Sequence, residues 1–344
     1  MSWAIAPSAV AGGGMSALVA AAKKEGTLNV IALPPTFANY RVILRTFSKL
    51  YGIKIRALDP DVGSQQEIRQ IKRAGATAQA ADVLDVQMPV ATANASLFAP
   101  YMVATWPSIP ASQKAADGAW VQDYGGYMSI GYDPGRFGRI TSLHQLLSRK
   151  FADAIALDGD PAQATSALYG VMMANLALGG SPDDISAGVN FFRKLAAAGN
   201  LVSVQATTPL TIKSGQTPVV INWDYLNTAP VVGRTGSTWR VFIPPGAALG
   251  SFYAQAINRN APHPAAARLW EEYLYSQRAN GGQNLWLKGG VRPVEQAAMT
   301  ADHTIDAARA APYPPVTGSG TFLSASQEAA AERYLARHWP REVR

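Results

Sequence analysis

The chain contains no cysteine. This absence excludes disulfides, thiolate metal sites, a cysteine nucleophile and the lipid-modified cysteine that begins a lipoprotein. Histidine is scarce as well, and the four that occur are far apart in the sequence: His144, His263, His303 and His338. A metal centre needs convergent His, Asp and Glu side chains. The sequence therefore predicts no metal site and no cofactor.

Charged residues make up only 15% of the chain. Lysines and arginines are scattered, and no basic run alternates with aromatic residues as a nucleic-acid groove requires. We therefore expect no nucleic-acid partner. The net charge of +7 favours solubility, with a mild preference for anionic ligands.

No apolar run near the start of the chain is long enough to span a bilayer. Residues 1–15 are small and weakly apolar, contain several glycines and lack a basic segment. They fit either a signal-peptide remnant or a disordered N-terminal extension, and both remain open. The chain has 344 residues, which is more than one hydrophobic core usually supports, so two domains are expected.

Motifs of catalysis are also absent. The sequence contains no Gly-x-Ser-x-Gly, His-Glu-x-x-His or Gly-x-x-x-x-Gly-Lys pattern. Asp158 with Asp160, or Asp183 with Asp184, could form a glycosidase pair of carboxylates. Asp183 and Asp184 are better placed in the first turn of a helix that starts at Pro182, where they stabilise its N-terminus. We expect no catalytic residues and no enzymatic activity.

Strand and helix patterns alternate along the first part of the chain. Residues 16–26 predict a helix that ends at Gly26, followed by a strand at 27–33, a helix at 39–51 and a strand at 53–58. This is a βαβ unit. A helix at 64–73, capped by Ser64 with Glu67 three residues later, and a strand at 82–86 extend it.

The middle of the chain reads as a second, inserted α/β domain. Strand patterns occur at residues 125–132, 154–157, 201–205 and 218–222, and helix patterns at 161–178 and 182–198. Crossings between the domains are expected near residues 128–132 and 251–256. The predicted division is therefore 16–128 plus 252–344 for lobe 1 and 129–251 for lobe 2. A helix at 324–339 closes the chain.

The last third carries the most informative stretch. Residues 244–257 (PPGAALGSFYAQAI) give a loop and a strand, 261–264 (APHP) a rigid turn, and 265–274 a helical pattern. Together with residues 285–294 (LWLKGGVRPV), this stretch resembles the return strand and closing helices of bacterial extracellular solute-binding proteins. The sequence AKKEG, followed closely by LNV, is similar to the opening of many such receptors.

The resemblance implies an α/β, two-lobed type II periplasmic-binding-protein fold, with two domains joined by crossing strands and a ligand cleft between them. It implies a monomeric receptor of an ABC importer, periplasmic or extracellular, that captures a small polar solute by lobe closure and delivers it to the ABC permease in the membrane. An enzyme on the same fold, such as a transferase or hydrolase, and a sensory solute receptor are the alternatives.

Candidate ligand residues follow from the rule that ligands bind at the carboxyl ends of strands in open α/β sheets. Polar side chains at these positions, with one tyrosine on the return strand, are Thr36, Asn39, Tyr40, Gln87, Gln163, Thr165 and Tyr253. The iron-binding branch of the family typically carries an adjacent pair of tyrosines in its second half. This chain has none there, so ferric capture is disfavoured.

A further cluster, Trp223-Asp224-Tyr225, follows the strand at residues 218–222. Aromatic faces beside a carboxylate suit an ammonium or guanidinium group and are similar to the clefts of polyamine receptors. Alternatively, the aromatics pack at the sheet edge and Asp224 caps the next helix. The cluster favours a polyamine or other amine, whereas the positive net charge favours an anion such as a phosphonate, and a zwitterionic aminophosphonate would satisfy both.

Overall fold

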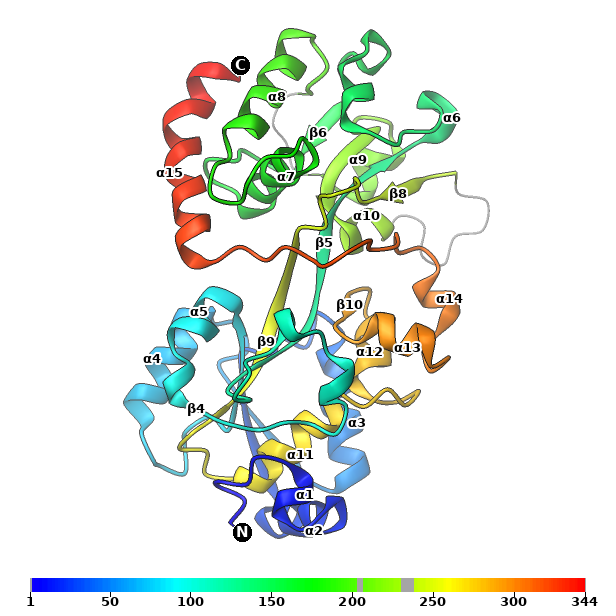
Figure 1. The fold of residues 1–344 in the computed structure, drawn as a ribbon. Coiled ribbons are helices and arrows are strands. Elements are labelled where there is room, and N and C mark those ends of the chain that lie inside the picture. Colours follow the sequence, from blue (N-terminus) through cyan, green and yellow to red (C-terminus); the bar gives the residue numbers. More distant parts are fainter. Residues whose placement is uncertain (1, 203–206, 230–237, 344) are drawn as a thin grey trace. The chain divides into compact units, whose positions relative to one another are not determined.

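The computed structural model describes residues 2–202, 207–229 and 238–343 (Figure 1). The chain divides into two compact units, Met1–Gly125 with Phe252–Ala307 and Gly126–Ser251 with Ala308–Arg344. It passes from one unit to the other within two long strands, β5 (Val121–Tyr132) and β9 (Gly250–Asn258), and again at α14 (Ala307–Ala310).

The sheet of unit 1 begins with three parallel strands, in the order β2 (Lys54–Leu58) at the edge, β1 (Thr27–Ile31) and β3 (Val83–Gln87). Strand β9 runs antiparallel beside β3. The short strands β4 (Phe98–Ala99) and β10 (Arg292–Pro293) pair with β9 and β5. Four of the five residues of β1, and of β3, are buried, as expected where helices cover a parallel sheet.

Helices connect these strands and pack on them. The α-helices of unit 1 are α1 (Ala9–Gly12), α2 (Met15–Glu25), α3 (Tyr40–Tyr51), α4 (Ser64–Ala74), α5 (Met88–Ala93), α11 (Pro264–Leu274), α12 (Gly282–Lys288) and α13 (Gln296–Ala301). Three short 3₁₀ turns, η1 (Ala95–Leu97), η2 (Trp106–Ser108) and η3 (Ala111–Gln113), complete the unit. None of the helices among the described residues has both the length and the apolar character needed to cross a membrane.

Residues 2–14 form part of unit 1. The guanidinium of Arg268 on α11 is buried and donates hydrogen bonds to the carbonyl oxygens of Ala4 (3.2 Å) and Ala6 (2.8 Å). Ser8 caps α1, and the backbone N–H of Met102 donates to the Pro7 carbonyl. The alternative of a disordered N-terminal extension is therefore wrong for these residues.

Two helix starts differ from the sequence prediction. Gly63, rather than Ser64, is the N-cap of α4, because the Ser64 hydroxyl accepts a hydrogen bond from the Gln87 backbone N–H instead. Helix α8 (Ser186–Ala197) begins four residues after Pro182. Asp184 accepts the Ser186 N–H in the turn before the helix, which lowers the pKa of this carboxyl.

In unit 2, β5 lies between two antiparallel partners, β7 (Val219–Trp223) and β8 (Arg240–Phe242), and β6 (Ile155–Leu157) runs parallel to β7. Leu201 makes a parallel bridge to Ile155, and residues 203–205 of the strand predicted there lie outside the described residues. The helices are α6 (Pro134–Phe137), η4 (Leu143–Leu147), η5 (Arg149–Phe151), α7 (Thr165–Ala177), α8, α9 (Pro209–Lys213), α10 (Asp224–Thr228) and α15 (Ala325–Glu342).

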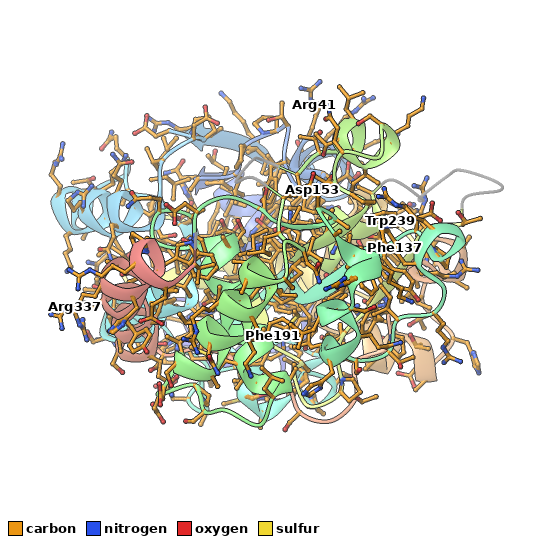
Figure 2. The ribbon with its side chains drawn as sticks, turned by 90° about the horizontal axis from the view of Figure 1, so that it is seen from above. Arg41, Phe137, Asp153, Phe191, Trp239 and Arg337 are labelled. Carbon is orange, nitrogen blue, oxygen red and sulfur yellow. The ribbon has the colours of Figure 1, made fainter. Side chains whose placement is uncertain are left out.

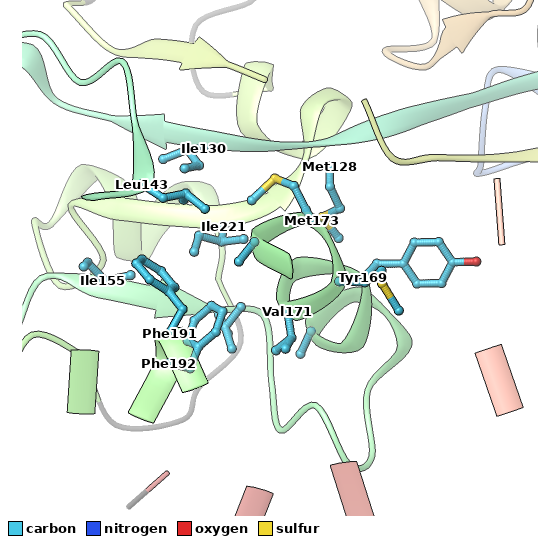
Figure 3. Packing of buried hydrophobic residues seen from close by; sticks show 14 of the residues in the cluster. Met128, Ile130, Leu143, Ile155, Tyr169, Val171, Met173, Phe191, Phe192 and Ile221 are labelled. Carbon is cyan, nitrogen blue, oxygen red and sulfur yellow. The ribbon is translucent and has the colours of Figure 1, made fainter. Parts of the chain in front are cut away.

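The core of unit 2 surrounds α7, whose residues from Ala167 to Asn175 are all buried. Met173 on this helix packs with Ile130 of β5 and Ile221 of β7 in the same apolar cluster (Figure 3). Side chains on α15 divide by exposure: Arg337 projects outward, as Figure 2 shows, while Trp339 is buried. A helix that is apolar on every side, such as α7, is typical of a unit interior.

Residues 308–344 group with unit 2, whereas the sequence placed them in lobe 1. Helix α15 packs against α8 and α7, and the Trp339 ring lies 5.5 Å from the Phe192 ring. Leu335 and Trp339 join the apolar cluster of unit 2. The apolar stripe of α15 can be read from the sequence, but the core that it covers is decided by the tertiary fold.

Candidate functional site

A cavity of about 290 Å³ lies in unit 1, at the carboxyl ends of the three parallel strands. Its wall is built from the segments that leave β1 and β2, from the end of β3, from two residues of α4, and from one residue each of β5 and β9. The lining residues are Ala32, Pro34, Phe37, Pro60, Asp61, Val62, Gly63, Ser64, Glu67, Asp85, Gln87, Tyr124 and Tyr253. This is the sheet edge where α/β proteins bind ligands.

The register of β3 and β9 brings the polar side chains together. Asp85 stands opposite Gln255, and Gln87 stands opposite Tyr253. Residues two apart on a strand share a face, so all four side chains lie on one side of the sheet. Helix α4 adds Glu67, whose Oε2 accepts the Asp85 N–H at 3.1 Å.

Aromatic rings form one wall of the cavity. Tyr124 and Tyr253 are stacked with ring centroids 5.5 Å apart and an interplanar angle of 23°. The Phe37 ring lies 6.1 Å from Tyr124, and its side chain remains 39% exposed. Three aromatic faces therefore border a cavity whose floor carries carboxyl groups.

Asp85 is the centre of a buried hydrogen-bond network. Its Oδ2 accepts the hydroxyl protons of Tyr40 (2.7 Å) and Tyr124 (2.9 Å). Asp123 accepts the Tyr124 N–H at 2.6 Å and the Gln255 Nε2 at 2.9 Å, and it is hydrogen-bonded to Asp85. Both carboxyl groups are almost completely removed from solvent.

Burial dominates the protonation of these acids. Loss of solvation raises the pKa of Asp85 to about 7, against the hydrogen bonds that lower it. Burial, and next the charge of Asp85, raise the pKa of Asp123 well above its ordinary value. The same two causes raise the pKa of Glu67. The cluster therefore retains protons at neutral pH.

The same environment keeps the phenols protonated. Burial, followed by the neighbouring carboxyl charges, raises the pKa of Tyr124 and of Tyr253. Within residues 2–202, 207–229 and 238–343, no group of three or more His, Asp or Glu side chains has an arrangement suited to a metal ion.

The structure places the predicted residues of unit 1 in different roles. Gln87 and Tyr253 line the cavity. Tyr40 is fully buried and reaches the site through its bond to Asp85. Thr36 is exposed in the segment that follows β1, and Asn39 donates to the Leu285 carbonyl at 2.8 Å.

In unit 2, Trp223 belongs to the apolar core, where its ring lies 5.2 Å from that of Tyr169. Tyr225 is half-buried and stacks parallel to Trp223 at 6.4 Å. Asp224 is the first residue of α10 and is fully buried, and its Oδ1 accepts the Tyr127 N–H at 3.2 Å. The buried indole of Trp223 therefore stabilises the core of unit 2.

The other two predicted residues of unit 2, Gln163 and Thr165, are exposed, and Thr165 is the first residue of α7. Helix α7 starts four residues after Pro161, so these two side chains lie at and just before its N-terminus.

Sequence reasoning missed four residues that line the cavity, Asp61, Glu67, Asp85 and Tyr124, and the buried Asp123 behind them. One signal was available. Asp85 stands inside the apolar strand pattern of residues 82–86, where a charged residue is seldom found without a partner. Asp123 and Tyr124 lie in β5 directly before the predicted strand at residues 125–132, and no local pattern marks them.

The architecture and this ligand-sized cavity define a two-lobed α/β solute receptor of the periplasmic-binding-protein type. Residues 83–312, more than half of the chain, match the family of bacterial extracellular solute-binding proteins, and the chain belongs to this family. It is accordingly an extracellular solute receptor of the ABC-transporter kind, which implies a periplasmic location. The sequence prediction of family and fold class is confirmed.

Solved structures with the same fold include "Trichodesmium (IdiA) (FutA) in complex with iron and citrate ligands" (TM-score 0.65, 17% identity, 91% of this chain and 99% of that chain). Iron-bound HitA from Pseudomonas aeruginosa is similar at a TM-score of 0.62 and 18% identity, over 90% and 99% of the two chains. AfuA from Actinobacillus pleuropneumoniae, with fructose-6-phosphate bound, is similar at 0.61 and 16%, over 92% and 98%. No curated protein matches the sequence. Identities this low support the fold alone.

Proposed function

We propose that this receptor captures a small cationic solute, a polyamine or other amine, in the cavity of unit 1. One observation carries the proposal: three carboxyl groups and three aromatic rings line the cavity, and no basic side chain does so among the described residues. The carboxyls belong to Asp61, Glu67 and Asp85, and the rings to Phe37, Tyr124 and Tyr253.

The chemistry of this lining matches an ammonium group. A cation over an aromatic face gains roughly 0.5 to 2 kcal/mol, and more when water is excluded. Asp85 adds a carboxylate at the floor, and Asp61 adds one at the exposed rim. An organic cation fits better than a metal ion, because no group of three or more His, Asp or Glu side chains among the described residues is arranged to hold a metal.

An anionic solute, such as a phosphonate or sugar phosphate, is the second candidate. The N-terminus of α4 borders the cavity at Gly63 and Ser64, and helix N-termini attract anions. AfuA, which shares the fold, holds fructose-6-phosphate. The exposed carboxylate of Asp61, in the segment before this helix, opposes such a ligand, and we therefore favour the amine.

The remaining features of the proposal follow from the family. The receptor binds its solute without chemical change, closes its lobes on it and delivers it to an ABC permease. Asp224 and Tyr225 remain proposed ligand contacts of unit 2, as do Gln163 and Thr165. A monomer without nucleic-acid partners completes this proposal.

Calorimetric titration tests the ligand class directly. We expect 1,4-diaminobutane to bind, and fructose-6-phosphate, methylphosphonate and ferric citrate not to bind. Asp61→Asn should weaken diamine binding about twofold to fivefold, as expected for an exposed charge pair. Asp302→Asn is the matched control, because Asp302 is exposed on the same unit and outside the cavity lining.

Binding of the phosphate or phosphonate without the diamine would overturn the proposal in favour of the anion. Recovery of an altered solute after incubation would instead indicate an enzyme.

A further inference from the structure

The paired carboxyl groups of Asp85 and Asp123 have a role beyond holding the sheet together. The two carboxyl groups act on each other inside unit 1, where Gln255 stands opposite Asp85 and donates to Asp123 at 2.9 Å. Oδ1 of Asp85 is buried with no hydrogen-bond partner among the described residues. Oε1 of Glu67, also at the cavity, is likewise buried without a partner. Acceptor atoms buried in this way are costly unless a proton or a ligand cation satisfies them.

Among the described residues, the groups that act most strongly on the pair include no positive charge. The groups that act most strongly on the two acids are Tyr40 from α3, Glu67 from α4, Tyr124 from β5, Tyr253 and Gln255 from β9, and Tyr275 after α11. All of them are phenols, acids or a neutral amide. Two adjacent carboxylates cannot both ionise in such a setting.

We propose that Asp85 and Asp123 share one proton, so that the pair presents a single negative charge to the cavity, and that a cationic solute binds to this charge on Asp85. This inference rests on the proposed function for its ligand and deepens it. Asp123 is then a positioning residue: its carboxyl stays neutral and hydrogen-bonds Asp85, which lines the cavity.

The arrangement predicts proton release on binding. Below neutral pH the empty pair carries a second proton, and a cation displaces that proton to solvent when it pairs with Asp85. Affinity for a cation should therefore rise with pH until Asp85 is already ionised. Because burial raises the pKa of Asp85 to about 7, the rise between pH 6 and pH 8 should be roughly tenfold.

Infrared spectroscopy of the unliganded full chain tests the shared proton without any ligand. A protonated carboxyl has a carbonyl stretch distinct from that of a carboxylate. We expect this signal at pH 8 in the wild type, a smaller signal in Asp123→Asn, and an unchanged one in Asp302→Asn. Glu271 is also buried, and its pKa is raised to about 8, so it contributes to the same infrared signal. The readout is therefore the difference in this signal between the wild type and each variant.

The second test is calorimetric titration with 1,4-diaminobutane, which measures its affinity. Repeating the titration in buffers of different ionisation enthalpy measures how many protons are released on binding. Asp85→Asn should weaken binding about tenfold to one hundredfold and abolish its pH dependence. Asp123→Asn should weaken binding far less, because the amide replaces a neutral carboxyl of the same shape. Thermal unfolding of each variant shows that it is folded.

The outcomes separate the two proposals. An Asp123→Asn spectrum identical to the wild type, or diamine affinity that is flat between pH 6 and pH 8, would overturn the shared proton. Absence of diamine binding at every pH would overturn the proposed function, while the infrared comparison would still decide the shared proton.

Discussion

At the scale of single residues, the cavity depends on side chains that combine an apolar body with one polar atom. Tyr253 stacks on Tyr124 and faces the cavity, so its ring contributes a surface and its hydroxyl a hydrogen bond. If the solute is an amine, the ring matters more than the hydroxyl, because the attraction comes from the aromatic face.

Replacement of this tyrosine separates the two contributions. Tyr253→Leu should weaken diamine binding roughly threefold to thirtyfold through loss of the aromatic face. Tyr253→Phe should retain most of the affinity. Calorimetric titration of both variants measures this contrast, and equal losses in the two would show that the hydroxyl, not the ring, holds the solute.

At the scale of elements, unit 2 depends on the close approach of α7 and α8. Gly188 on α8 faces the backbone of α7, and a Cβ added there would lie 2.4 Å from the Val171 carbonyl oxygen. Backbone cannot move aside as a flexible side chain can. The glycine therefore sets the spacing of the two helices.

A methyl group at this position tests that conclusion. Gly188→Ala should reduce the free energy of unfolding by about 1 to 3 kcal/mol, as overpacking does in protein cores. The exposed Lys194 on the same helix supplies the control, since Lys194→Ala should change stability by less than about 0.5 kcal/mol. Chemical denaturation measures both, and a neutral Gly188→Ala would show that the helices can separate at little cost.

At the scale of the whole molecule, buried acids are concentrated in unit 1. Burial raises the pKa of Glu271 to about 8 and that of Glu295 to about 7, as it does for Asp85. The hydrogen bond that the His263 ring donates to the Asp82 carboxylate raises the pKa of this histidine, in the same unit. Each of these groups binds its proton more tightly in the folded chain than in the unfolded one.

The sign of the pH dependence follows from linkage. Stability from a raised pKa is complete below the unfolded value and is lost as the pH rises to the folded value. We expect unit 1 to be more stable near pH 5 than near pH 8, with each fully buried acid contributing up to about 1.4 kcal/mol per pH unit in that window. Scanning calorimetry against pH measures this loss, and Glu271→Gln should reduce its slope. A transition of unit 1 that rises between pH 5 and pH 8 would contradict the argument.

The sequence by itself determined the family and the class of fold. The signals it used are local: the hydrophobic periodicity of strands and helices, the glycines that end helices, and the motifs at residues 244–294. Each of them reflects backbone geometry or the burial of one face. They placed α2, α3, α4 and α11 to within one residue of their observed ends. Strand-end reasoning also pointed to Gln87, which lines the cavity.

Only the tertiary structure decided which side chains meet. Asp85, Asp123 and Glu67 lie far apart in the sequence and come together because β3, β5 and α4 converge on one sheet edge. The same packing places Trp223 in the core of unit 2, although its neighbourhood in the sequence suggested a binding surface. Register and packing are set by contacts between distant segments, so no local pattern in the chain could fix them.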